Sequence, residues 1–125
     1  MIDADCDIWI PAARPDVIRA DNAPRLRARL VLQGANVPFT AEAEQSLAAR
    51  GVIVVPDFIA NAGGVICAAM EFAGATRGTA FDAIAEKVQA NTEAVLSASR
   101  SQGRTPRDTA TQMAIDRLKA WIVKQ

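Results

Sequence analysis

The segment at residues 52–65, VIVVPDFIANAGGV, constrains the fold of this chain more than any other. It begins as a short β-branched apolar run, breaks at Pro56, and passes through Asn61 into Gly63 and Gly64. Open α/β sheets form ligand crevices at the carboxyl ends of such strands, because an amide side chain can bind the ligand and glycine lets it approach the backbone. The segment therefore predicts a strand that ends at a binding site.

Two earlier runs have the same character. CDIWI at residues 6–10 and LVLQ at residues 30–33 are strand-like, and each is followed by small or amide-bearing residues. Those residues are Pro11 and Ala12 after the first run, and Gly34 and Asn36 after the second. Three strand ends of this kind are expected to form one wall of a nucleotide site.

The three runs are nearly continuously apolar and helical patterns separate them, so we expect parallel strands that are buried on both faces. The fold class is α/β: half of a doubly wound parallel sheet, with about three strands, flanking helices and a helical C-terminal tail. Helices are predicted at residues 22–29, 41–50, 61–73, 79–101 and 105–123. Their caps are Asn22, Thr40, a capping box of Thr79 with Asp82, and Thr105 followed by Pro106 and Asp108.

The composition limits the classes of function. Fourteen basic and fourteen acidic residues balance, which gives no electrostatic reason to expect nucleic acid or an anionic membrane as a partner. The chain has no histidine, and Cys6 and Cys67 lack CxxC spacing; both are predicted to be reduced core thiols, and no metal site is expected. No apolar run approaches the about 20 residues of a membrane span, and the acidic N-terminus is unlike a signal peptide. We therefore expect a cytoplasmic location.

The segments CDIWIPAA, LVLQGANVPFTAEAEQSLAARGVIVVPDFIANAGGV and ICAAMEF carry GAN and PDxxxNAGGV motifs in register. From about residue 5 to residue 72 they resemble the C-terminal part of the nicotinamide-binding domain of the glutamate/leucine/phenylalanine/valine dehydrogenase family. The resemblance implies a Rossmann-like fold and NAD- or NADP-dependent oxidative deamination of an α-amino acid to a 2-oxo acid. It also implies that Asn61 and Asn36 lie near the nicotinamide and its ribose, and that backbone approaches the cofactor at Pro11, Ala12 and Gly34.

The same resemblance implies that Gly64 and Val65 line the amino-acid pocket, and it raises a question about the substrate. Glutamate-specific members carry a serine three residues after the valine of GGV, whereas this chain has Ala68. Alanine cannot bind a carboxylate, which favours an apolar amino acid over glutamate. Alternatively, Ala68 is a helix-packing residue with no part in substrate binding. Asp57 and Glu71 are candidate carboxylates by position, and both are interpreted as partners of helix dipoles.

Several parts of a complete dehydrogenase have no counterpart in this sequence. A dinucleotide fold needs a GxGxxG turn, which does not occur here. The family's catalytic lysine and aspartate belong to a separate substrate domain, so no catalytic residue is assigned in this chain. The lysines Lys87, Lys119 and Lys124 lie in late helices and are interpreted as solvated.

We therefore predict that residues 1–73 form half of a cofactor domain, and that residues 74–125 form helices that pack on it or on a partner chain. The isolated chain is expected to be inactive and to bind NAD or NADP weakly. Its exposed strand edge and last helix predict a dimer or larger assembly. The alternatives are a non-enzymatic truncated module that acts only in folding or association, and a weak nucleotide-binding half-site.

Overall fold

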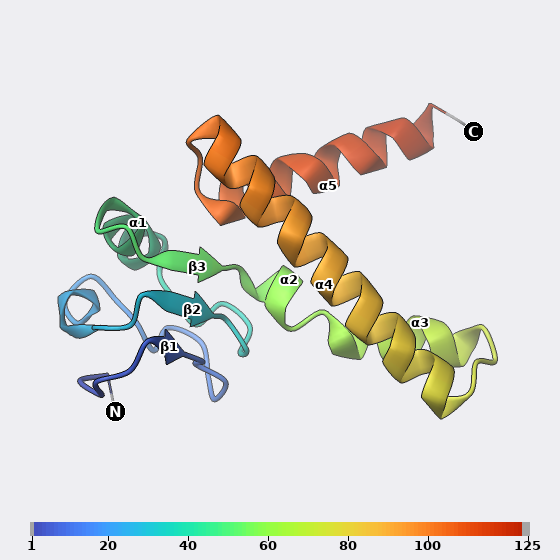
Figure 1. The fold of residues 1–125 in the computed structure, drawn as a ribbon, viewed down its shortest axis with the longest axis horizontal. Helices are drawn as coiled ribbons and strands as arrows, with labels where there is room; N and C mark the ends of the chain where they lie inside the picture. Colours follow the sequence, from blue (N-terminus) through green and yellow to red (C-terminus); the bar gives the residue numbers. More distant parts are fainter. Residues whose placement is uncertain (1, 124–125) are drawn as a thin grey trace.

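The computed structural model describes residues 2–123, and it contains a three-stranded parallel sheet with helices around it (Figure 1). The strands are β1 (Ile8–Trp9), β2 (Leu30–Leu32) and β3 (Ile53–Val55), in the order β1-β2-β3. The register pairs Trp9 with Val31, and Val31 with Val54. The predicted α/β half-sheet is therefore confirmed, although each strand is shorter than its apolar run.

The connection from β1 to β2 differs from the prediction. In place of a helix at residues 22–29 there is a single 3-10 turn, η1 (Ala23–Arg25). The Asn22 side chain does not cap it; its Oδ1 accepts from the Arg19 amide at 2.8 Å and its Nδ2 donates to the Val17 carbonyl at 3.0 Å. Leu26 then turns extended and buries its side chain in the core. Tertiary burial of Leu26 outweighs the local helix signal.

Helix α1 (Ala41–Ala49) begins and ends where the sequence predicts. Thr40 is its N-cap and accepts from the Ala43 amide at 3.4 Å, and Gly51 follows it with a φ of 78°. The apolar face of α1 packs against β3 and η1, and its buried residues Ala43 and Leu47 join the core. The core also contains Ile18, Leu26, Val31, Phe39 and Val54.

The segment after β3 forms two helices instead of one. Pro56 is the N-cap of α2 (Asp57–Ala60), and α3 (Gly63–Phe72) follows after a break at Asn61 and Ala62. The predicted single helix at residues 61–73 is thus correct for α3 only. Asn61 lies between the two helices, and α2 follows β3 directly at the carboxyl edge of the sheet (Figure 1).

The last two helices are α4 (Arg77–Gln102) and α5 (Pro106–Ile122). Thr76, not Thr79, is the N-cap of α4: its Oγ1 accepts from the Thr79 amide at 3.3 Å, so the predicted capping box is wrong. Thr105 caps α5 as predicted, with Pro106 at the first helical position. Helix α4 crosses from the sheet to α3, and α5 packs on β3 and α4 before its far end projects away (Figure 1).

Exposed apolar side chains occur on several elements, including Val65 and Phe72 on α3 and Phe81 on α4, and two further groups lie at the edges of the fold. Ile8 on β1 and Ile10 directly after it are more than half exposed, while Trp9 stacks on Phe39 with ring centroids 6.5 Å apart. On the projecting part of α5, the exposed residues are Leu118, Trp121 and Ile122. Among residues 2–123, no helix has both the length and the apolar character that crossing a bilayer requires.

Candidate functional site

The carboxyl ends of β1 and β2 meet closely. The Ala35 amide donates to the Pro11 carbonyl at 2.7 Å, which extends the pairing of the two strands beyond the sheet itself. A Cβ added at Gly34 would lie 3.2 Å from the Ala12 Cβ and 3.3 Å from the Ile10 Cγ2. A side chain at position 34 would therefore press on these neighbours, which would have to shift by a few tenths of an ångström, and the structure brings together Pro11, Ala12 and Gly34.

The two asparagines that the sequence singled out are in contact. Asn61 Nδ2 donates to Asn36 Oδ1 at 2.8 Å and to the Gly34 carbonyl at 3.4 Å. Both asparagines line a cavity of about 470 Å³ at the strand ends. The cavity is also lined by Asp57, Phe58, Ala62, Val65, Ile66, Lys87 and Asn91. Amide groups beside apolar walls can hold a polar planar ligand, because each amide offers both a donor and an acceptor.

The three substrate-pocket candidates are distributed along α3. Val65 lines the cavity with the asparagines. Gly64 is exposed, with open space where a Cβ would stand, and Ala68 is exposed one turn further along. Neither Gly64 nor Ala68 is among the residues that line the cavity. Lys87, interpreted as solvated, is exposed but borders the cavity from α4, and Lys124 lies outside the described residues.

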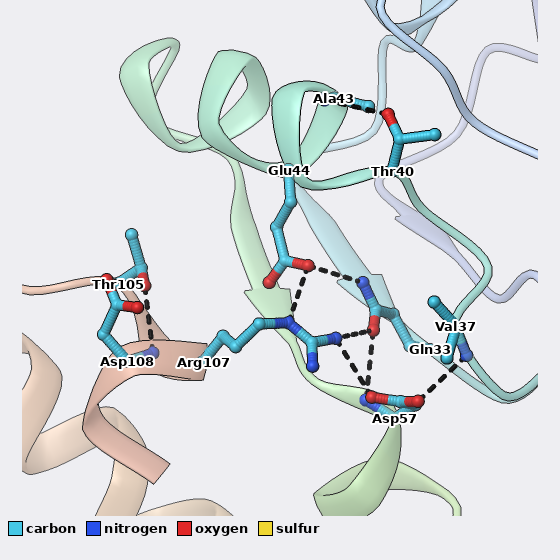
Figure 2. Close-up of polar contacts among 9 residues, drawn as sticks. All are labelled: Gln33, Val37, Thr40, Ala43, Glu44, Asp57, Thr105, Arg107 and Asp108. Carbon is cyan, nitrogen blue, oxygen red and sulfur yellow. Dashed lines mark hydrogen bonds and ion pairs between the residues drawn. The ribbon is translucent and has the colours of Figure 1, made fainter. Parts of the chain in front are cut away.

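Beneath this surface lies a polar network that the sequence did not predict (Figure 2). Arg107, in the first turn of α5, reaches across to three elements. Its Nε lies 2.8 Å from Glu44 Oε2 on α1, and its Nη2 lies 3.0 Å from Asp57 Oδ1 at the start of α2. The same Nη2 donates to Gln33 Oε1, just after β2, at 2.7 Å. One guanidinium therefore ties α5 to α1, β2 and α2.

Gln33 completes the network. Its Nε2 donates to Glu44 Oε2 at 3.3 Å, and its Oε1 accepts from the Asp57 amide at 3.1 Å. Gln33 is fully buried and the carboxylates of Glu44 and Asp57 are nearly so, whereas about a third of the Arg107 side chain is exposed. The Arg107 guanidinium also lies over the Phe58 ring, 5.5 Å from its centroid. Glu44 Oε1 is buried and has no hydrogen-bond partner among the described residues.

The network changes the pKa of Asp57 and of Arg107. Burial of Asp57 raises its pKa, but the hydrogen bond from the Val37 amide and the ion pair with Arg107 outweigh burial, so the pKa lies below the usual 3.8. Burial lowers the pKa of Arg107, yet pairing with Glu44 and Asp57 raises it overall. Asp57 and Arg107 are therefore held in their charged forms.

Asp57 also controls the loop that carries Asn36. Its Oδ2 accepts from the Val37 amide at 2.9 Å. Val37 has a φ of 46°, a left-handed conformation that a β-branched residue rarely adopts. The residue directly after Asn36 is thus held in a strained backbone conformation by a carboxylate.

Sequence reasoning interpreted Asp57 as a helix-dipole partner, and it does lie in the first turn of a helix, α2, but the prediction missed Arg107, the partner that Asp57 shares with Glu44. The missed signal was Gln33. A polar residue that ends an apolar strand must find buried partners, because an unsatisfied buried amide is costly. Cys6 and Cys67 are free thiols as predicted, but both are half-buried and neither lies in the core. Residues 2–123 contain no group of three or more cysteine, aspartate or glutamate side chains placed to hold a metal ion.

Comparison with known proteins agrees with this geometry. The chain matches the family described as "Glutamate/Leucine/Phenylalanine/Valine dehydrogenase" over residues 1–125. It is 48% identical over 73 residues to the "NADP-specific glutamate dehydrogenase" of Saccharolobus shibatae, which covers 58% of this chain and 17% of that protein. It is 40% identical over 133 residues to the "NADP(+)-dependent glutamate dehydrogenase" of Pyrobaculum calidifontis, covering 94% of this chain and 31% of that protein.

Among solved structures, the L-tryptophan dehydrogenase from Nostoc punctiforme superimposes with a TM-score of 0.87 at 29% identity. The superposition covers 95% of this chain and 36% of that enzyme. The chain therefore spans about a third or less of the length of each of these relatives.

Proposed function

Because this chain belongs to the glutamate/leucine/phenylalanine/valine dehydrogenase family, we propose that it is the C-terminal part of the cofactor-binding half of an amino-acid dehydrogenase. The parent reaction would be NAD(P)-dependent oxidative deamination of an α-amino acid to a 2-oxo acid. One observation carries the proposal: Asn36 and Asn61 meet at the carboxyl ends of two parallel strands, on the wall of a 470 Å³ cavity.

The residues present fit one end of a dinucleotide. Ala12 and Gly34 lie close together next to Pro11, and a Cβ at position 34 would be in tight contact with Ala12. The amides of Asn36 and Asn61 suit the carboxamide and ribose hydroxyls of a nicotinamide nucleoside. The cofactor would supply the hydride chemistry, and this chain would orient its reactive end. A second phosphate-binding element is needed for tight binding, since the chain carries no GxGxxG turn.

In this proposal, residues 1–73 are the half-domain that holds the cofactor, and residues 74–125 are helices that pack on it or on a partner chain. Pro11, Ala12, Gly34, Asn36 and Asn61 face the cofactor. Gly64, Val65 and Ala68 face the amino acid. The named relatives that act on glutamate support glutamate as the substrate, whereas Ala68 supports an apolar amino acid.

We also propose that the chain associates with itself, in the cytoplasm, as a dimer or larger assembly. The exposed apolar residues of β1 and of the far end of α5 support this, because such surfaces recruit partners. In the alternative proposal the chain is a non-enzymatic module, and self-association is its whole function.

Nuclear magnetic resonance titration of the purified chain with NAD and NADP tests the cofactor proposal. Weak binding, with a dissociation constant of about 1 mM, should move the side-chain amides of Asn36 and Asn61. The variant Asn61→Ala should lose these shifts, while Gln112→Ala, which changes an exposed amide on α5 that does not line the cavity, should keep them. Saturable binding that leaves both amides unmoved would contradict the proposed site.

An activity assay separates the two candidate functions. The isolated chain should produce no NADH or NADPH from glutamate, leucine, valine or phenylalanine above a boiled control. The reaction requires cofactor and amino acid to be held in contact, and this chain provides groups for only part of that site. Turnover by the chain alone would show that the half-site proposal is wrong. A chain that shows no nucleotide-induced shifts at all would favour the non-enzymatic module.

A further inference from the structure

We propose that Arg107 is a positioning residue for the strand-end site: acting through Asp57, it holds the left-handed backbone of Val37 and thereby fixes Asn36 against Asn61. The inference rests on the proposed function for its purpose, which is to orient a nucleotide. The contacts that connect α5 to Asn36 are present without any ligand.

The first step is the strain at Val37. Its φ of 46° is unfavourable for a β-branched residue, so the loop after Gly34 needs an external restraint to keep this conformation. The Val37 side chain is exposed and supplies little packing of its own. Two hydrogen bonds restrain it: the Val37 carbonyl accepts from the Asp16 amide at 3.0 Å, and the Val37 amide donates to Asp57 Oδ2 at 2.9 Å. Only the second leads, through the Asp57 carboxylate, to Arg107.

The second step is the placement of Asp57. Its backbone amide donates to Gln33 Oε1 at 3.1 Å, and its second oxygen, Oδ1, receives Arg107 Nη2 at 3.0 Å. The carboxylate thus lies between two donors, one on each oxygen (Figure 2). Removing the guanidinium would leave a nearly buried carboxylate without its charged donor, held by backbone amides alone.

The third step is the choice of arginine. Its planar fork reaches Glu44 with Nε while Nη2 reaches both Gln33 and Asp57, and its plane lies over the Phe58 ring. A lysine would keep the charge but could not bridge the same partners. The docking of α5 on the sheet therefore affects the conformation of Val37, the residue next to Asn36. We call this chain of contacts, from Arg107 through Asp57 to Val37 and Asn36, the relay.

A double-mutant cycle on the full chain, followed by nuclear magnetic resonance without ligand, tests this relay. The variants are Arg107→Met, Val37→Gly and their combination, because glycine adopts the left-handed conformation without the restraint. The readouts are hydrogen exchange at the amide of residue 37 and the shift of the Asn61 side-chain amide that bonds Asn36. Arg100→Met is the matched control, since Arg100 is an exposed arginine at the end of α4.

Arg107→Met should speed exchange at Val37 by about tenfold or more, the factor that a hydrogen bond to a charged group contributes. It should also move the Asn61 amide toward a solvent-exposed shift. In the Val37→Gly background, the same substitution should move the Asn61 amide much less. Equal effects in both backgrounds, or an equal effect of Arg100→Met, would overturn the relay and leave Arg107 a merely structural residue.

Arg107→Lys and a pH titration cover the case in which Arg107→Met does not fold. The lysine variant should show an intermediate exchange rate at Val37, and a wild-type rate would overturn the proposal. In the wild-type chain, the Val37 amide shift should follow protonation of Asp57 below pH 3.8. A Val37 amide shift that does not change when Asp57 is protonated would also overturn the proposed relay.

Addition of NAD separates this inference from the proposed function. If the wild-type chain shows no NAD-induced shift at Asn36, the nucleotide site is wrong, but the cycle above still decides the relay. If NAD moves Asn36 in the wild type and less in Arg107→Met, with Val37→Gly restoring the response, the relay positions the site. Full NAD response in Arg107→Met would contradict the positioning role.

Discussion

Arg107 and Glu44 are joined by an ion pair of 2.8 Å across 63 residues of sequence. Glu44 is nearly buried on α1, and the same guanidinium also neutralises Asp57. Two buried carboxylates therefore depend on one partly exposed arginine. The stability of the sheet's carboxyl edge is concentrated in that one side chain.

Replacing Arg107 by methionine should destabilise the fold, because it leaves two buried carboxylates unpaired. The expected loss in the free energy of unfolding is about 1–3 kcal/mol. This lies between the losses typical of surface ion pairs and of buried ion pairs, because about a third of the arginine side chain is exposed. Urea unfolding measures it. Arg100→Met should change the free energy by no more than about 0.5 kcal/mol. Equal losses for the two variants would show that the network contributes no stability.

Acid should weaken the fold through Asp57. Its folded-state pKa lies below 3.8, so the unfolded chain binds the proton first, and the stability from Asp57 is present above that value and lost as pH falls through the folded pKa. The Asp57→Asn variant should therefore lose less stability than the wild type between about pH 6 and pH 3. Thermal unfolding across this range measures the difference.

Asp3 provides the control for the acid prediction. Its pKa is also lowered, by a hydrogen bond and ion pair with Arg25, but both side chains are exposed. In about 1 M salt, the contribution of Asp3 should vanish while that of Asp57 persists, because buried pairs are screened less. A pH profile of Asp57→Asn identical to the wild type would contradict the assigned pairing.

Two glycine substitutions should act in opposite directions. Gly34→Ala should cost about 1–3 kcal/mol, because its Cβ would press on Ala12 and Ile10 where β1 and β2 meet. Gly64→Ala should gain about 0.5–1 kcal/mol, since α3 has open space there and alanine favours the helix. Denaturant unfolding of both variants tests the contrast. A neutral Gly34→Ala would mean that the two strand ends separate easily.

The chain should form a dimer or larger assembly at micromolar concentration. Light scattering coupled to size exclusion measures the mass, and Ile10→Lys or Trp121→Lys should reduce it by charging one of the two exposed apolar surfaces. Phe72→Lys is the control, because Phe72 is 97% exposed and belongs to neither surface. A soluble wild-type monomer would end the association proposal.

Local signals predicted much of this fold. Thr40 and Gly51 define α1, and Thr105 with Pro106 starts α5, because caps act on backbone groups within one turn. Where two local signals competed, the prediction was less reliable. Thr76 and Thr79 are three residues apart, and the extended backbone after Gly74 made Thr76 the cap.

The candidate site was predicted only in part, for a physical reason. Asn36 follows β2, and Asn61 follows β3 after the short helix α2. Parallel strands bring their carboxyl ends together, so the topology places both asparagines near one edge of the sheet. The partnership of Arg107 with Gln33 and Glu44 depends on how α5 docks on the sheet. Side-chain packing decides that docking, and no periodicity in the sequence encodes it.

The hydrogen bond between Gln33 and Arg107 closes a loop of 74 residues. Closing so long a loop costs chain entropy before any contact is gained, and contacts of this kind form late in folding. During synthesis, the first three strands and α1 can pair before the ribosome reaches residue 107. The strand ends would then exist as a partly ordered surface, and the Asp57 carboxylate that bonds the Val37 amide would gain its charged partner only when α5 arrives.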